Sequence, residues 1–231
     1  MSRVLVIPDV HCPLMISNFP DWLYDTFDQW ECDRVVMIGD LVDLHSLSMH
    51  PKIPGYNNPI EEKEKAQNQI DDLVKRFPKA DWLLGNHDAL PYRWMESVGI
   101  PESMMKDPGR IWNTKKWKIH PRYSDLIIDK CIYRHGDKGK GGGRLAALPN
   151  ALAEFRSVIQ GHHHQQGGVE YAQNNAGKIF GMQVGTGINH KAIDGQMAYA
   201  KKFSARPVLG CGVVIDGKAG VFEPMPERYL K

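Results

Sequence analysis

The chain has 231 residues, of which 42% are hydrophobic and 24% are charged, and its formal net charge is +2. This composition is typical of a soluble globular protein, and a charge so close to zero does not by itself indicate a nucleic-acid-binding protein. No apolar run approaches the ~18 residues that a membrane-spanning helix needs, so we expect no membrane partner.

Two further features of the sequence bear on location. The apolar run at the N-terminus is too short for a signal peptide, and Asp9 would interrupt one. The four cysteines are widely spaced and form no C-x-x-C pair, so we expect reduced thiols and no all-thiolate zinc site. The sequence therefore predicts a cytoplasmic protein, and it leaves the oligomeric state open.

The first part of the chain predicts strands that alternate with helices. Residues 3–8, 34–38 and 81–84 are short apolar runs of the kind that forms buried parallel strands. Residues 19–30 and 60–77 carry apolar side chains near helical spacing, which predicts two helices that cover the sheet. The resulting β-α-β-α-β order favours an α/β fold.

The remainder of the chain predicts mostly β-structure. Residues 89–120 show no clear period, and we expect an irregular segment that forms a variable cap-like insertion. The elements predicted after it are a helix over 145–155 and strands over 123–128, 131–134, 157–160, 169–173, 179–184, 208–215 and 219–222. Asp216-Gly217 is a strong hairpin signal between the last two strands. With no linker or internal repeat, the sequence predicts a single domain over 1–231, an α/β sandwich with helices covering a two-sheet core.

Five polar clusters follow predicted strands directly. In chain order they are Asp9-x-His11, Gly39-Asp40-x-x-Asp43, Gly85-Asn86-His87-Asp88, His135-Gly136-Asp137 and Gly161-His162-x-His164. Each cluster alone is weak evidence, but five in succession at strand ends are hard to explain by chance. Ligands of α/β sheets bind where strands end in loops at the carboxyl edge, so the clusters could converge on one site.

The three consecutive histidines at 162–164 allow two interpretations. They follow a predicted buried strand and a glycine, and the spacing of His162 and His164 can send both rings toward one metal ion. The alternative is a solvated, tag-like tract. The four earlier clusters favour the metal site, and mixed Asp, His and Asn ligands suit manganese, iron or zinc better than calcium.

In their order and spacing, the five clusters resemble the motifs of the calcineurin-like metallophosphoesterase family. Those motifs are D-x-H, G-D-x-x-D, G-N-H-D/E, a histidine near H-G, and G-H-x-H, and the match extends from Asp9 to His164, about two thirds of the chain. The resemblance implies a four-layer α/β/β/α sandwich with two central mixed β-sheets. It also implies two divalent metal ions as cofactors, with Mn2+ as the first choice and Fe, Zn, Ni or Co as alternatives.

The resemblance further implies a role for each cluster residue. One metal ion would be held by Asp9, His11 and His164, and the second by Asn86, His135 and His162. Asp40 would bridge both ions through its two carboxylate oxygens. His87 would be catalytic, contacting the phosphate or protonating the leaving group. Asp88 and Asp43 would orient His87 and the ligand loop.

Such a site predicts hydrolysis of phosphate esters by in-line attack of a metal-bound hydroxide, because metal binding lowers the pKa of water to roughly 7. The sequence does not choose between phosphomonoesters and phosphodiesters. One alternative is a nuclease-like phosphodiesterase acting on DNA or RNA, since the Trp- and Lys-rich residues 92–118 could stack bases. A cap with its tryptophans packed inward is the favoured interpretation of that stretch. A second alternative is a non-catalytic metal-binding scaffold, although every expected ligand is present.

The residues that would hold the substrate phosphate are predicted less directly. Lys138, Lys140 and Arg144 surround a glycine loop just after His135. They form either a phosphate clamp, with help from backbone N–H groups, or a flexible solvated loop, and the sequence favours neither. His163 alternates away from its neighbours, and we expect it to face solvent or substrate.

Overall fold

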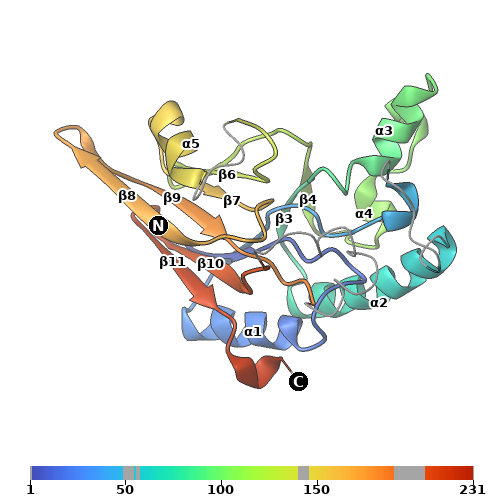
Figure 1. Cartoon of the computed structure of the whole chain (residues 1–231), viewed down its shortest axis with the longest axis horizontal. Coiled ribbons are helices and arrows are strands. Elements are labelled where there is room, and N and C mark those ends of the chain that lie inside the picture. The colour runs from blue at the N-terminus through green and yellow to red at the C-terminus, as the bar shows by residue number, and fades with distance from the viewer. Residues whose placement is uncertain (1, 49–54, 56–57, 140–145, 190–205, 231) are drawn as a thin grey trace.

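The computed structural model describes residues 2–48, 55, 58–139, 146–189 and 206–230. Its strands form two mixed sheets, one of six strands and one of five. The sheets pack face to face around a shared apolar core, and helices cover their outer sides (Figure 1). The predicted α/β sandwich with two central mixed sheets is therefore confirmed.

The six-stranded sheet has the strand order β11-β10-β1-β2-β3-β4. Its strands are β1 (Arg3–Ile7), β2 (Arg34–Met37), β3 (Asp81–Leu83), β4 (Lys118–His120), β10 (Gly210–Ile215) and β11 (Ala219–Pro224). β1 to β4 are parallel to one another, while β10 is antiparallel to β1 and β11 is antiparallel to β10.

The five-stranded sheet has the strand order β5-β6-β7-β9-β8. Its strands are β5 (Leu126–Ile128), β6 (Cys131–Arg134), β7 (Val158–Gln160), β8 (Gly167–Asn174) and β9 (Gly177–Val184). β6, β7 and β9 are parallel, and the edge strands β5 and β8 are antiparallel to their neighbours.

The alternation of side chains along β1 shows how the layers arise. Val4 and Val6 belong to the core between the two sheets, whereas Leu5 and Ile7 belong to the core beneath the helices. The helices are α1 (Phe19–Gln29), α2 (Pro59–Arg76), α3 (Leu90–Ser97), α4 (Pro108–Ile111) and α5 (Ala147–Glu154), with short 3-10 turns η1 (His45–Leu47), η2 (Glu102–Met104) and η5 (Glu227–Tyr229). None of the helices in the described ranges combines the length and apolar character needed to cross a membrane.

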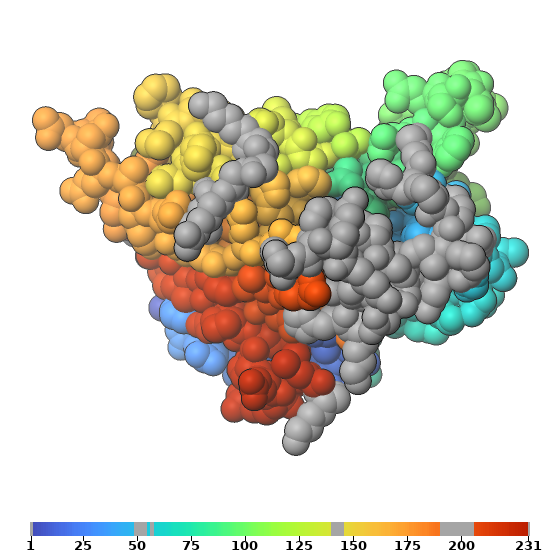
Figure 2. All heavy atoms as spheres, viewed as in Figure 1, coloured from blue at the N-terminus to red at the C-terminus, as the bar shows by residue number. Residues whose placement is uncertain are grey.

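The expectation that residues 89–120 lack regular structure is wrong. This segment contains α3, η2, α4 and β4, and β4 extends the first sheet beside β3. The two helices have only 8 and 4 residues, which is too short to show a helical period. Trp112 and Trp117 are buried, as the inward-packed interpretation predicts, while Trp94 is 43% exposed. Figure 2 shows the region of α3 projecting from the body of the molecule.

Two tight turns meet at one end of the sheets. Asp129 and Lys130 join β5 to β6 with φ of +46° and +67°, and Asp216 and Gly217 lie between β10 and β11 with φ of +54° and +65°. Positive φ at both central residues defines the type I′ turn, which confirms the predicted hairpin at Asp216-Gly217. The turns pack together, since Cys131 Sγ lies 3.2 Å from the Gly217 carbonyl oxygen.

Candidate metal centre

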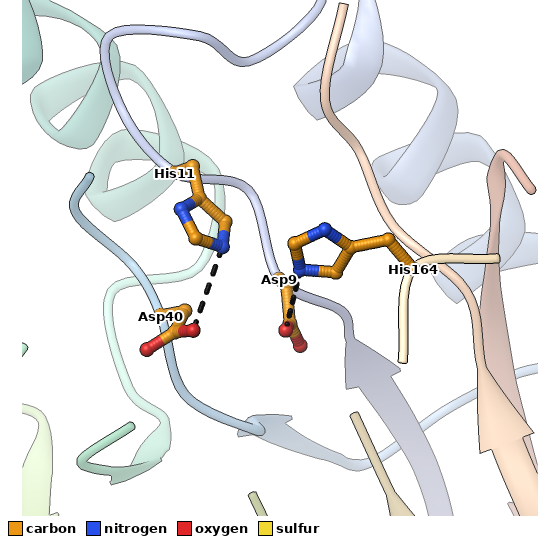
Figure 3. Close-up of side chains that lie close together, drawn as sticks. All are labelled: Asp9, His11, Asp40 and His164. Atoms are coloured by element: carbon orange, nitrogen blue, oxygen red, sulfur yellow. Dashed lines mark hydrogen bonds and ion pairs between the residues drawn. The ribbon is translucent and has the colours of Figure 1, made fainter. Parts of the chain in front are cut away.

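The five polar clusters meet at one edge of the two sheets. Asp9, Asp40 and Asn86 follow the parallel strands β1, β2 and β3, and His135 and His162 follow the parallel strands β6 and β7. Parallel strands end at the same edge of a sheet, so the loops that follow them share one region. Figure 3 shows four of the gathered side chains, which are Asp9, His11, Asp40 and His164.

Three groups of these side chains have the spacing of metal ligands. Within each group, the candidate ligand atoms lie within 4.8 Å of one another. One of them is His11, Asp43 and His87, and the other two match the ligand sets predicted from the sequence. Of these two, the first group comprises Asp9, His11, Asp40 and His164, and the second comprises Asp40, His135 and His162. Asp40 is common to both groups. Asn86 lies beside the second group, with Oδ1 3.0 Å from His135 Nε2.

The first group is fixed by contacts among its own members and by Asp43. Asp9 Oδ2 lies 3.0 Å from His164 Nε2, and Asp40 Oδ2 lies 3.5 Å from His11 Nε2. The other ring nitrogen of His11, Nδ1, lies 3.0 Å from Asp43 Oδ1. A carboxylate that accepts a hydrogen bond from Nδ1 leaves the Nε2 lone pair free for a metal ion. Asp43 is therefore placed where it can orient His11.

His135 is the centre of the second group. Its Nε2 lies 3.3 Å from Asp40 Oδ2 and 3.0 Å from Asn86 Oδ1. Its Nδ1 lies 3.2 Å from the Ile38 carbonyl oxygen, which favours a proton on Nδ1 and leaves Nε2 as the ligand atom. His162 reaches the group from the turn after β7, where its φ is +67°.

The donor atoms at this site fit divalent metal ions. Asp9 Oδ1 and His11 Nε2 are buried, and neither forms a hydrogen bond with any described residue. Buried polar atoms normally have a partner, and a cation would supply one for both. Carboxylate, imidazole and amide donors together suit manganese, iron or zinc. The residues present therefore fit the two ions that the sequence resemblance implies.

Carboxylates and imidazoles in this site shift one another's pKa. Burial alone would raise the pKa of Asp40, but the charges of His135 and His87 outweigh burial and hold that pKa well below its usual range. Burial would lower the pKa of His135, but Asp40 and Asp9 raise it to about 10. Burial and the charge of His135 lower the pKa of His162 to about 4. The site therefore attracts positive charge and keeps His162 neutral, as a metal ligand must be.

Metal binding at this site is expected to release a proton. The raised pKa of His135 keeps a proton on the ring at neutral pH, and imidazole must lose that proton to bind a metal ion. The affinity for Mn2+ should therefore rise with pH, by up to about tenfold per unit below that pKa. Calorimetric titration in buffers of different ionisation enthalpy measures the released proton. An affinity that stays constant from about pH 6 to pH 8 would contradict this expectation.

Two glycines allow the backbone to approach the site carboxylates closely. A Cβ atom added at Gly85 would lie 2.1 Å from Asp40 Oδ1, and one added at Gly161 would lie 2.2 Å from Asp9 Oδ1. Both distances are far shorter than van der Waals contact. Asp40 cannot move away without losing the hydrogen bond that the His87 backbone N–H donates to its Oδ1 at 2.8 Å. Any side chain at Gly85 would therefore disturb the carboxylate that both ligand groups share.

Gly85→Ala is expected to displace the Asp40 carboxylate and to weaken Mn2+ binding by about 10–100-fold, the usual scale for losing ligand orientation. Glu64→Ala is a suitable control, because Glu64 is an exposed residue of α2. Metal content after dialysis and Mn2+ titration provide the measurements, with circular dichroism to establish folding. Unchanged Mn2+ affinity in folded Gly85→Ala protein would show that Asp40 tolerates the displacement.

His87 lies at the rim of the site, with its side chain 26% exposed. Its Nδ1 is 2.6 Å from the Asp43 carbonyl oxygen. Its ring packs edge-on against His11, with 4.5 Å between the ring centroids. A ring held through Nδ1 has Nε2 available for a phosphate oxygen or a leaving group.

Asp88 holds the backbone of two ligand loops together. Its Oδ1 accepts a hydrogen bond from the Val42 N–H at 3.2 Å, and its Oδ2 accepts one from the Gly85 N–H at 2.9 Å. These bonds tie the loop after β2 to the loop after β3. Burial, and then the charge of Asp40, raise the pKa of Asp88 to about 7. Its Oδ2 also accepts a hydrogen bond from Trp82 Nε1 at 3.3 Å. The predicted action of Asp88 on the His87 ring stays a prediction.

The predicted substrate-binding residues are only partly described. Lys138 Nζ lies 3.2 Å from the Tyr123 carbonyl oxygen, so its ammonium group contacts the protein itself. Lys140 and Arg144 lie outside the described residues. His163 is half-buried, and its Nε2 is buried without a hydrogen bond to any described residue. The phosphate clamp and the role of His163 therefore stay predictions.

Three buried amide side chains support the turn that carries His162, and the sequence analysis did not identify them. Asn150 Nδ2 donates to Gln160 Oε1 at 2.8 Å, and Gln160 Nε2 donates to Gln183 Oε1 at 3.2 Å. Gln183 Nε2 in turn donates to the Gly161 carbonyl oxygen. The sequence signal for this support is Gln160, a glutamine at the end of an apolar strand. Such a residue is easily interpreted as the exposed end of the strand.

The chain thus combines a two-sheet α/β sandwich with a buried cluster of Asp and His side chains at its strand ends. This combination defines the class of α/β proteins with a candidate metal centre. The family described as calcineurin-like phosphoesterase matches residues 2–171. The chain belongs to this family. No curated protein matches the chain in sequence.

Solved structures with a similar fold include two proteins of low sequence identity. The phosphoesterase Yfce from E. coli is 13% identical, with 92% of this chain and 88% of that chain covered and a TM-score of 0.43. Vacuolar protein sorting 29 from Cryptosporidium parvum is 15% identical, with 97% and 98% covered and a TM-score of 0.42.

Proposed function

We propose that the protein is a dinuclear metal-dependent phosphoesterase that hydrolyses phosphate esters. The observation that carries this proposal is the position of Asp40, which belongs to both groups of ligand atoms. A carboxylate has two oxygens, so one residue can contact two cations and offset their mutual repulsion. Two bridged metal ions are a recurrent device for in-line displacement at phosphorus. Membership of the phosphoesterase family supports the same class of reaction.

When bound, two divalent ions supply a water of lowered pKa and neutralise charge on the phosphate. The residues of the chain position the ions and handle the proton on the leaving group. His87 is held through Nδ1 by the Asp43 carbonyl and can donate a proton from Nε2. Burial lowers the pKa of His87, but the charges of Asp40 and Asp43 outweigh burial and raise it. The ring therefore keeps its proton to a higher pH than an unperturbed imidazole does.

The substrate is a phosphomonoester or a phosphodiester, and Mn2+ is the first choice of metal ion. Trp112 and Trp117 are buried and offer no stacking surface, so Trp94 is the one tryptophan of residues 92–118 that supports a nuclease acting on DNA or RNA. All four cysteines are buried free thiols, which supports our proposal of a cytoplasmic location.

The test is hydrolysis of p-nitrophenyl phosphate beside bis-p-nitrophenyl phosphate, with protein stripped by a chelator and reloaded with Mn2+. We expect turnover only after reloading. A preference for the monoester would indicate a phosphatase, and a preference for the diester would indicate a phosphodiesterase. Bound Mn2+ without turnover of either compound would indicate a narrow substrate range or a metal-binding scaffold.

A further inference from the structure

A groove of about 790 Å³ lies at the opposite ends of the strands from the metal centre. Its walls are the turn before β6, the segment before β7, the start of β9 and the turn between β10 and β11. β6 and β7 have 4 and 3 residues, and at about 3.3 Å per residue they separate the groove from the metal centre by roughly 10 Å or more. A molecule in the groove would therefore leave the metal centre accessible.

Phe155, on the wall of the groove, is both strained and exposed. It follows α5 with a φ of +52°, in the left-handed region that favours glycine. The Arg156 N–H donates to the Ala151 carbonyl oxygen at 3.1 Å, as at helix ends where glycine normally takes this position. The Phe155 side chain is nevertheless 87% exposed, and Ile127 on the same groove is 54% exposed. Phe155 and Ile127 together give the groove an exposed apolar surface, the kind of feature that marks a site of interaction.

The groove also carries an excess of positive charge. Four cationic side chains line it, at Lys130, Arg156, Lys178 and Lys218. Lys178 lies over the Tyr171 ring, and the other three form no ion pair with any described residue. The acidic residues on the groove are Asp129 and Asp216, and Asp129 already accepts two hydrogen bonds, at 2.9 Å and 2.7 Å, from Ser2. The groove therefore combines exposed apolar side chains with cationic ones.

We propose that this groove docks an acidic peptide segment of a protein partner. An apolar side chain of the peptide would pack on Phe155 and Ile127, and its carboxylates would face the lysines and the arginine. The volume suits a segment of a few residues. Single-stranded nucleic acid needs a series of aromatic faces for successive bases, and Phe155 is the one aromatic side chain among the described residues of the groove. The wall therefore favours a peptide over a nucleic acid.

Selection of random peptides displayed on phage against the full-length protein provides the probe for this proposal. The enriched peptides should combine Asp or Glu with large apolar residues. Fluorescence anisotropy of one labelled peptide then gives the affinity. Wild-type binding should weaken as salt is added, because exposed charges are screened.

Phe155→Gly separates a binding role from a structural one. Glycine is favoured at a φ of +52°, so this variant should melt at the same temperature as the wild type or higher. Peptide binding should nevertheless fall by about tenfold or more, because the apolar anchor is lost. A double variant of Lys130→Glu and Lys218→Glu should lose binding to a similar extent, while Lys79→Glu, which lies outside this groove, should bind like the wild type.

Several results would overturn the proposal. These are a failure to enrich any peptide, enrichment of peptides without acidic residues, and equal binding by Phe155→Gly. Tighter binding of labelled oligothymidylate than of the peptide would assign the groove to nucleic acid instead. None of these measurements uses the metal centre, so they stand whatever the phosphoesterase assay shows.

Discussion

Asp40→Ala should lose metal from at least one site and lower the turnover of a phosphate ester by about 10³-fold or more, because a bound metal ion contributes several kcal/mol to phosphoryl chemistry. The Asp40 carboxylate is nearly inaccessible to solvent, and it lies 3.5 Å from His11 Nε2 and 3.3 Å from His135 Nε2. Its removal takes one negative charge from both ligand groups at once. Metal content per chain and turnover of the preferred ester are the two measurements.

Two further variants make the result specific to the charge of Asp40. Asp40→Asn keeps the shape of the side chain and an acceptor for the His87 backbone N–H, so it tests the charge without opening a cavity. Asp28→Ala removes an exposed carboxylate from α1 and should behave like the wild type. If Asp40→Ala protein still binds two Mn2+ ions with unchanged affinity, Asp40 does not bridge them, and the dinuclear proposal loses its main support.

The sequence was sufficient to predict the sheets and the edge where the site lies. Val4 to Ile7 are apolar on both faces, and such a run forms a strand that is buried on both sides. A run of this kind that ends in Asp9-x-His11 predicts a strand, and it also predicts that candidate metal ligands lie in the loop directly after that strand. The hairpin at Asp216-Gly217 was predictable for an equally local reason, because a type I′ turn needs positive φ at both central residues.

The features that the sequence did not reveal depend on distant contacts. Gln183 supports the Gly161 turn from a strand 22 residues further along the chain, and nothing near Gln183 indicates that partner. The close approach of Gly85 to Asp40 likewise depends on how β2 and β3 pair. The sequence predicts a helix over 145–155, but the helix ends at Glu154 and Phe155 lies outside it with a positive φ. Periodicity records which side chains are buried, and it carries no signal for a strained residue that faces solvent.

His87→Ala is expected to keep its metal ions and to lower turnover by about 10²–10⁴-fold, the usual scale of general acid–base catalysis. Its Nδ1 is occupied by the Asp43 carbonyl, so Nε2 is the atom that can act on the substrate. The decrease should be larger for phenyl phosphate than for p-nitrophenyl phosphate, because p-nitrophenolate leaves without needing a proton. That difference separates proton donation from a role in binding the phosphate, which would affect both esters equally.

The pH dependence gives an independent test of His87. Its pKa is raised by Asp40 and Asp43 against the effect of burial, so the ring loses its proton at a higher pH than an unperturbed imidazole does. Wild-type turnover of phenyl phosphate should fall as pH rises through that pKa, and His87→Ala should lack this decline. His120→Ala is the matched control. His120 Nε2 lies 2.7 Å from Asp81 Oδ1, and His120 belongs to none of the ligand groups. Loss of metal from His87→Ala would instead make His87 a ligand, and equal losses on both esters would remove it as the proton donor.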